Sequence, residues 1–226
     1  MPNRSLIRPG VLAFLCGFVD TIVFVHMGGL FVAHVTGNFV LLGATIVGTG
    51  ATGAHSETTL LQIASFPVFV FAAFVATLLH DRWPSLDARN LLWAVAGLVM
   101  VAAFWSVLGA APDVGASMLL VCAMATLNAA QRLAPGIGPP TTVMTGNTTQ
   151  VAVSLARRMR SVPGREANAP ILRMPAFLVT TFLIGCVLGA FGANWVGLGA
   201  VAFPAALLIV ILATDRDAGS GRPPLR

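Results

Sequence analysis

Apolar segments long enough to cross or enter a membrane follow one another along nearly the whole chain. Eight can be marked, each bounded by a polar or glycine-rich break: residues 10–27, 30–50, 60–80, 91–110, 116–133, 140–156, 171–193 and 196–213. A helix that spans a bilayer needs about 20 predominantly apolar residues. The pattern therefore predicts an all-α integral membrane protein and leaves no room for a soluble domain.

Composition agrees with this prediction. Of the 226 residues, 57% are hydrophobic and only 9% are charged, whereas soluble domains have about 25% charged residues. All 13 basic residues behind the net charge of +5 are Arg, and there is no Lys. The arginines form no dense basic run with aromatic residues, so nucleic acid is not an expected partner. Cys16, Cys122 and Cys186 lie singly inside apolar segments, so neither a metal nor a cofactor is expected.

A short phrase occurs once in each half of the chain, as His34-Val35-Thr36-Gly37-Asn38 and Val143-Met144-Thr145-Gly146-Asn147. Shifting the chain by 109 residues superposes the two Thr-Gly-Asn triplets, and a shift of 108 superposes Asp20 on Asn128. The pattern predicts a duplicated unit within one polytopic domain. Its parts are repeat 1 over about 10–110, repeat 2 over about 116–213, and a flexible cytoplasmic tail over 214–226.

The positions of the arginines indicate how many segments cross, because Arg and Lys gather in cytoplasmic loops. If all eight segments cross, Arg82, Arg89 and Arg132 fall outside. If the second segment of each half enters and leaves the membrane on the same side, six segments span and all 13 Arg become cytoplasmic. We therefore predict six transmembrane helices, with both termini in the cytoplasm.

Three crossings per repeat invert the second repeat relative to the first, an architecture typical of secondary transporters. The prediction is two inverted three-helix repeats, each with a broken or re-entrant segment that carries its Thr-Gly-Asn triplet. The two segments would enter from opposite faces and meet near the midplane. Residues 139–142 and 145–150 are too polar to face lipid, which favours a centre lined by protein or water.

Asp20 is the only acidic residue within an apolar segment. A charge at the bilayer centre costs about 2.5–3.5 kcal/mol, so Asp20 is expected to face the interior, where burial favours its neutral form and lets it load and release a proton. The alternative is that it only bonds to a neighbouring helix. Asn128 at the equivalent place, with Gln131 one turn later, is a further candidate for binding. His26 and His34 are candidate proton relays.

Each triplet combines a hydroxyl, a glycine and an amide, so both are expected to bind a substrate or ion: Thr36, Gly37 and Asn38, and Thr145, Gly146 and Asn147. Thr and Asn are good helix N-caps. Short helices over about 39–47 and 150–156 would then point their positive ends at the centre. The alternative is that these small residues only pack helices closely.

The stretches Gly17-Phe18-Val19-Asp20, Gly28 to Asn38 and Thr142 to Asn147 closely resemble the YoaK-like bacterial membrane proteins, a family of unknown function. The resemblance covers most of the chain. It implies a multi-pass protein of the bacterial inner membrane, and it implies no substrate. The chain departs from the family at Leu127, which precedes Asn128 where the family often has Gln.

These features predict a small-molecule or ion transporter or exporter of the bacterial inner membrane, with Asp20 as the residue through which protons would be coupled. The alternatives are a passive channel lined by the half-helices and a non-transporting scaffold or partner subunit. The chain contains no Gly-x-Ser-x-Gly, no His-Glu-x-x-His and no phosphate loop, so it is not expected to be an enzyme. The expected partners are the lipid bilayer and a small molecule or ion; a homodimer is left open.

Overall fold

The computed structural model describes residues 4–48, 56–83, 85–109, 113–159 and 169–214. The described chain is helical and has no strand, which confirms the all-α prediction. Its elements are α1 (Arg4–His26), α2 (Val35–Ile46), α3 (Ser56–Arg82), α4 (Ala88–Leu108), α5 (Val114–Leu133), η1 (Pro135–Ile137), α6 (Met144–Met159), α7 (Ala169–Trp195), η3 (Leu198–Val201) and α8 (Ala202–Thr214). The tail beyond residue 214 lies outside the described residues.

Five helices within the described residues are long and apolar enough to cross a bilayer, namely α1, α3, α4, α5 and α7. Two further apolar helices are shorter: α2, and the stretch Leu198–Thr214 formed by η3 and α8. The chain is therefore a membrane protein, as its hydrophobic pattern indicates. α6 is more polar, with several Thr residues at its start and Arg157 and Arg158 near its end.

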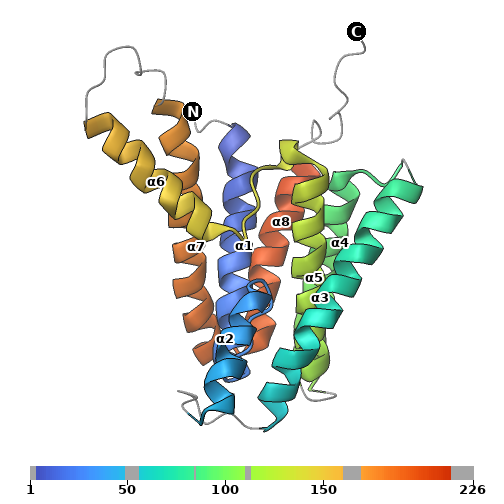
Figure 1. The fold of residues 1–226 in the computed structure, drawn as a ribbon. Helices are drawn as coiled ribbons and strands as arrows, with labels where there is room; N and C mark the ends of the chain where they lie inside the picture. The colour runs from blue at the N-terminus through green and yellow to red at the C-terminus, as the bar shows by residue number, and fades with distance from the viewer. Residues whose placement is uncertain (1–3, 49–55, 84, 110–112, 160–168, 215–226) are drawn as a thin grey trace.

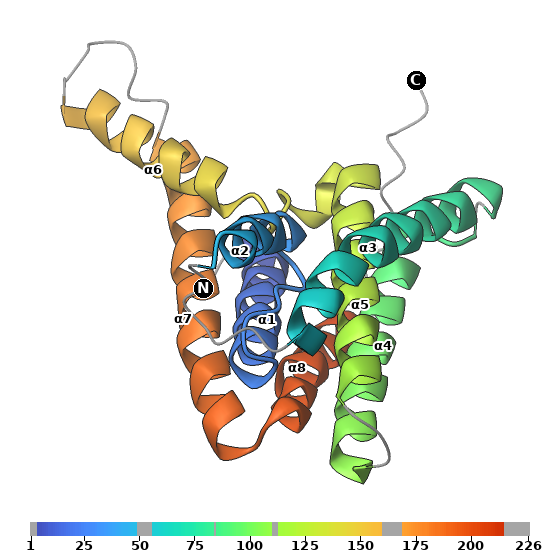
Figure 2. The ribbon, with the colours of Figure 1, turned by 60° about the horizontal axis from the view of Figure 1, so that its bottom comes forward.

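The helices form a bundle in which α1 and α5 are central. In α1, 78% of the most apolar stretch is buried and in α5 67%, against 11% in α3 and 17% in α7. α1 packs against α7, and α5 packs in the same way against α3 (Figure 2). The short helix α2 lies on α3, and α6 lies on α7. The contact between α4 and α8 completes this pattern. Each of these pairings thus has a counterpart when α1, α2, α3 and α4 are matched in order with α5, α6, α7 and α8.

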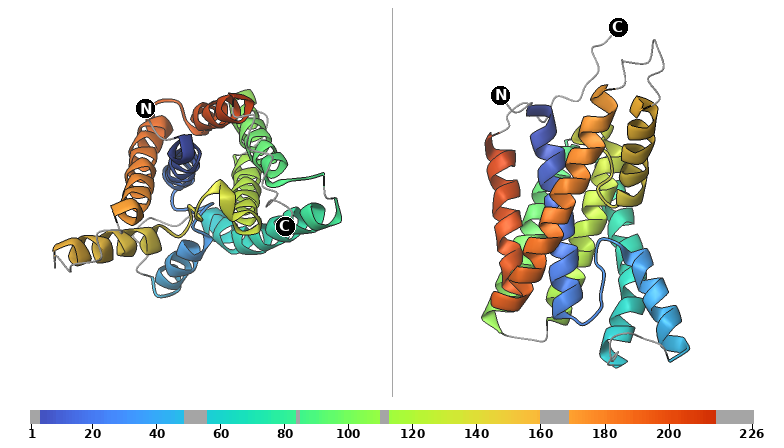
Figure 3. Two further views of the ribbon diagram at one scale, coloured as in Figure 1. Left: turned by 90° about the horizontal axis from the view of Figure 1, so that it is seen from above. Right: turned by 90° about the vertical axis from the view of Figure 1, so that its left-hand side faces the viewer.

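The directions of the helices are plain in Figures 1 and 3. α1, α4 and α7 run from the upper end of Figure 1 to the lower end, and α3, α5 and α8 run upward. α2 instead begins near mid-height and runs to the lower end, whereas α6 begins near mid-height and runs to the upper end. The loops that lead into α2 and α6 therefore reach the middle of the bundle from opposite ends.

Glycine permits the sharp reversal at the lower end of α1. Gly28 and Gly29 adopt φ angles of 66° and 119°, in the region that side-chain-bearing residues rarely enter. The chain can therefore turn directly after His26 and climb back along α1. We call residues 27–34 the first loop, and residues 134–143, which connect α5 to α6, the second loop.

The contact between α1 and α7 depends on glycine for a different reason. A Cβ atom at Gly185 would lie 2.3 Å from the carbonyl oxygen of Phe14, and one at Gly189 would lie 2.5 Å from that of Phe18. On α1, a Cβ at Gly17 would lie 2.3 Å from the carbonyl oxygen of Phe182. Small residues four apart let membrane helices approach backbone to backbone, and this packs α7 directly on α1, next to the site.

Gly185→Ala should separate α1 from α7, because the added methyl group meets backbone that cannot move aside. We expect the free energy of unfolding to fall by about 1–3 kcal/mol, measured by dodecyl sulfate titration in mixed micelles. Gly97→Ala in α4 is the matched control, since no atom lies within 4 Å of its Cβ position. Equal losses in the two variants would contradict this account of the contact.

Candidate functional site

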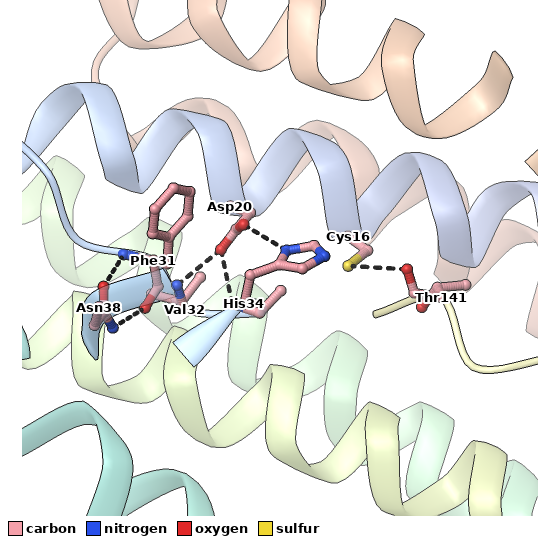
Figure 4. Close-up of polar contacts among 8 residues, drawn as sticks. Cys16, Asp20, Phe31, Val32, His34, Asn38 and Thr141 are labelled. Atoms are coloured by element: carbon pink, nitrogen blue, oxygen red, sulfur yellow. Dashed lines mark hydrogen bonds and ion pairs between the residues drawn. The ribbon is translucent and has the colours of Figure 1, made fainter. Parts of the chain in front are cut away.

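The site is built around Asp20, which lies 4% exposed within α1. Its Oδ1 atom accepts the backbone N–H groups of Val32 at 2.8 Å and Ala33 at 2.7 Å. Its Oδ2 atom lies 2.8 Å from Nδ1 of His34 (Figure 4). An ionised carboxylate is an acceptor only, and these contacts suit that form. Asp20 thus holds the last residues of the first loop directly before α2.

Asn38 of the first triplet holds the same loop from the other side. Its Oδ1 accepts the N–H of Phe31 at 2.9 Å, and its Nδ2 donates to the Phe31 carbonyl at 2.8 Å (Figure 4). Nδ2 also donates to Oγ of Ser65 on α3, at 2.8 Å. Asn38 is fully buried. Its amide therefore serves the fold of the loop in this conformation.

Three polar residues of α3 complete the support of the first loop, and sequence reasoning missed them. Thr58 donates to the carbonyl of Met27 at 3.1 Å, Gln62 donates to that of Gly29 at 2.7 Å, and Ser65 bonds Asn38. Their spacing of four and three residues places them on one face of a helix. That polar stripe on an otherwise apolar segment is the signal that would have revealed them.

The second loop is held by the two residues of α5 that the sequence singled out. Oε1 of Gln131 accepts the N–H of Thr141 at 3.0 Å, and its Nε2 donates to the carbonyl of Pro139 at 3.1 Å. Oδ1 of Asn128 accepts the hydroxyl of Thr142 at 2.9 Å. Gln131 and Asn128 are 2% and 9% exposed. The second loop is thus hydrogen-bonded by the neutral amides of α5, whereas the first loop is hydrogen-bonded by the carboxylate of Asp20.

The second triplet is used differently from the first. Thr145 and Gly146 are exposed, and Asn147 is only partly buried. Within the described residues, the side chain of Asn147 makes a weak contact, from Nδ2 to Sδ of Met144 at 3.8 Å. Of the two equivalent asparagines, Asn147 is therefore the one with an amide left to bind something else.

Both triplets lie in the first turn of a helix, since α2 begins at Val35 and α6 at Met144. The expectation that the triplets cap helices starting after them is therefore wrong. In α2 the N-cap position belongs to His34, whose side chain makes no cap hydrogen bond and instead contacts Asp20. Thr36 is exposed, while Gly37 lies so close to the ring of Phe31 that a Cβ atom would come within 2.8 Å.

The two loops meet along α1. Sγ of Cys16 lies 4.0 Å from the carbonyl oxygen of Thr141 in the second loop, and Cys16 is one helical turn before Asp20, on the same face. Figure 4 shows both contacts on this side of α1. The ring of His34 packs edge-on against Phe182 of α7, with ring centres 5.6 Å apart. α1 therefore brings the first loop, the second loop and α7 together.

A search against protein-family models matches residues 10–214 to the family described as "Protein of unknown function (DUF1275)". The chain belongs to this family. The match confirms the resemblance that the motifs around Asp20 and the triplets indicated, since YoaK-like proteins are consistent with it. No curated protein and no solved structure matches the chain.

The structure separates the two candidate relay histidines. His34 contacts Asp20, whereas Nε2 of His26 lies 2.6 Å from Oδ2 of Asp113 at the start of α5. The contact of His26 therefore joins α1 to α5 at the lower end of the bundle (Figure 1). Among the described residues, no three His, Cys, Asp or Glu side chains gather as metal ligands.

Asn38→Ala should destabilise the fold, because it leaves the part-buried N–H and carbonyl groups of Phe31 without their partner and removes one bond to Ser65. Each buried group that loses its partner costs about 1–3 kcal/mol, so we expect a loss of at least about 2 kcal/mol. Asn147→Ala, at the same position of the second triplet, should cost less than about 1 kcal/mol.

The measurement is dodecyl sulfate unfolding of both variants and the wild type in mixed micelles, followed by circular dichroism. A loss for Asn147→Ala as large as that for Asn38→Ala would show that the two triplets carry equal structural roles, against the contacts described above.

Proposed function

We propose that this protein is a transporter or exporter of a small molecule or ion in the bacterial inner membrane. The observation that carries the proposal is the pair of non-helical loops that meet at the centre of an apolar bundle beside Asp20. Irregular backbone and ionised side chains at membrane depth are costly and mark ion or substrate pathways. The family assignment supports a membrane location and leaves the substrate open.

The proposed topology has six spans in two inverted repeats, with both termini in the cytoplasm. The alternating directions of α1, α3, α4, α5, α7 and α8 support it (Figure 1). The stretch Leu198–Thr214 would be the sixth span, near the lower limit of length. The exchange of helix pairings between the halves supports the repeat, and three spans per repeat make it inverted.

The proposed substrate path lies between the starts of α2 and α6. The groups available there are the hydroxyls of Thr36 and Thr145, the amide of Asn147 and the partly exposed ring of His34. Donors and acceptors are both present, so a polar molecule can be bound from several sides. The two helix N-termini add a weak positive potential at the same place.

Proton coupling is proposed to run through the pair of Asp20 and His34. The pair is close, with 2.8 Å between Oδ2 and Nδ1, and it is the one His–Asp pair among the described residues that lies at the centre of the bundle. A His–carboxylate pair can change its charge near neutral pH. This property suits a transporter that is driven by a proton gradient.

A scaffold without transport activity is the second candidate, because protein groups already satisfy much of the site. Asp20 and Asn38 are 4% and 0% exposed and are fully hydrogen-bonded to the first loop. A cavity of about 370 Å³ lies away from the site, at the end of α3 beside Leu78 and Trp83. Flux measurements distinguish a transporter from the alternatives. A scaffold gives no flux, and the flux through a channel rises linearly with concentration and does not saturate.

Asn147→Ala should lower saturable flux about tenfold, because one hydrogen bond worth about 1.4 kcal/mol to the transported molecule is lost. Purified protein is reconstituted in vesicles of phosphatidylethanolamine and phosphatidylglycerol that contain a pH-sensitive dye. Panels of small organic acids, amines and inorganic ions are then added outside. Thr180→Val on α7 is the control, since its exposed hydroxyl bonds the Ala176 carbonyl of its own helix.

The control variant should transport as the wild type does. Absence of flux in the wild type for every compound, with the protein inserted and folded, would favour the scaffold. Equal flux in Asn147→Ala and the wild type would remove Asn147 from the proposed path.

A further inference from the structure

The two oxygens of Asp20 have different partners. Oδ1 faces the N–H groups of Val32 and Ala33 at 2.8 and 2.7 Å. Peptide N–H groups are donors at every physiological pH, so a proton on Oδ1 would place a hydroxyl against two donors. Oδ1 therefore acts only as a hydrogen-bond acceptor for the first loop, and the ionised form of Asp20 fits these contacts.

The remaining oxygen fixes the state of His34. Oδ2 lies 2.8 Å from Nδ1 of His34, so in the neutral ring the hydrogen belongs on Nδ1 and the lone pair on Nε2. The side chain of His34 is 28% exposed, against 6% for that of Asp20. A proton that arrives from outside the pair therefore has Nε2 as its acceptor.

The charge that results can be accommodated at this depth. A proton on Nε2 makes an imidazolium directly opposite the carboxylate of Asp20, so the pair carries no net charge. A paired charge avoids most of the penalty that a buried lone ion would face. Loss of the proton leaves the carboxylate with its three donors, and the first loop keeps its support in both states.

The neighbouring elements add no competing charge within the described residues. The titratable groups around the pair are Cys16 of α1 and Cys186 of α7, and thiols are neutral near pH 7. α7 otherwise presents the ring of Phe182 to His34. In the second repeat, Val143 and Asn128 stand where the first has His34 and Asp20, and neither can titrate.

We propose that His34, through Nε2, is the single proton carrier of each chain, and that Asp20 is its fixed counter-charge and positioning residue. The inference rests on the proposed transport function and moves the titrating proton from Asp20 to His34. His34 directly precedes α2, and its carbonyl accepts the N–H of Gly37 at 2.7 Å. A change of charge on the ring therefore acts at the start of α2.

The test reads protonation directly, on the full-length protein in lipid nanodiscs. Imidazole nitrogen resonances of ¹⁵N-histidine-labelled protein are recorded from about pH 5 to 8, and His34 is assigned by the resonance that His34→Gln removes. Infrared difference spectra over the same range report any protonated carboxyl group through its carbonyl stretch. We expect His34 to change from neutral to doubly protonated on acidification, with no Asp20 carboxyl band.

Two variants separate a positioning role from a general structural one. Asp20→Asn should lower the midpoint of the His34 titration by about one pH unit or more, because the counter-charge is lost. His26→Gln, which breaks the other His–Asp pair, should leave the midpoint unchanged. If Asp20→Asn does not fold, the wild-type and His34→Gln spectra still decide the question.

The inference is overturned if His34 stays neutral throughout, or if a carboxyl band appears on acidification that Asp20→Asn removes. Flux assays in vesicles test the transport function separately. With transport present, His34→Gln should abolish the dependence of flux on the pH gradient. Absence of any wild-type flux would reject the proposed function, and the spectra would still show which group binds the proton.

Discussion

A carboxylate buried inside an apolar bundle needs hydrogen-bond donors, and a non-helical loop buried beside it needs acceptors. Asp20 and the first loop satisfy each other, because two backbone N–H groups and the ring of His34 converge on one side chain. Each group left unpaired at membrane depth costs several kcal/mol, so neither would persist there alone. Three features depend on these hydrogen bonds between Asp20 and the first loop: the position of the start of α2, the polar stripe on α3 and the orientation of His34.

The second loop is held by neutral groups instead. Gln131 and Asn128 bind the second loop through amides, so no charge is buried. Because α5 supplies this support, Asn147 is not drawn into the loop as Asn38 is. The duplicated triplet therefore has one copy that serves the fold and one copy whose amide is available. This asymmetry supports the proposal that the central region binds a ligand and changes charge in one half only.

Much of this arrangement could be predicted from the sequence, because hydrophobic periodicity locates helices and an isolated Asp, Asn or Gln in an apolar segment must find a partner. Asp20, Asn128 and Gln131 all bind a loop beside their own helix. The start of α2 could not be predicted, since the triplet resembles a cap while α2 begins before it, at Val35, without a side-chain cap. Long-range partners such as Ser65 for Asn38 and Asp113 for His26 depend on tertiary packing, which local patterns do not encode.

The central claim is that the two triplet-bearing segments enter the membrane from opposite faces and meet at α1. Single cysteines at Val47, just after α2, and at Met159, the end of α6, test it most directly, because both side chains are exposed, at 70% and 79%. The three native cysteines are first replaced by serine or alanine, and a membrane-impermeant maleimide is applied to intact cells and to inverted vesicles. Labelling of Val47→Cys in cells and of Met159→Cys in inverted vesicles is predicted, whereas labelling of both from the same face would contradict the account.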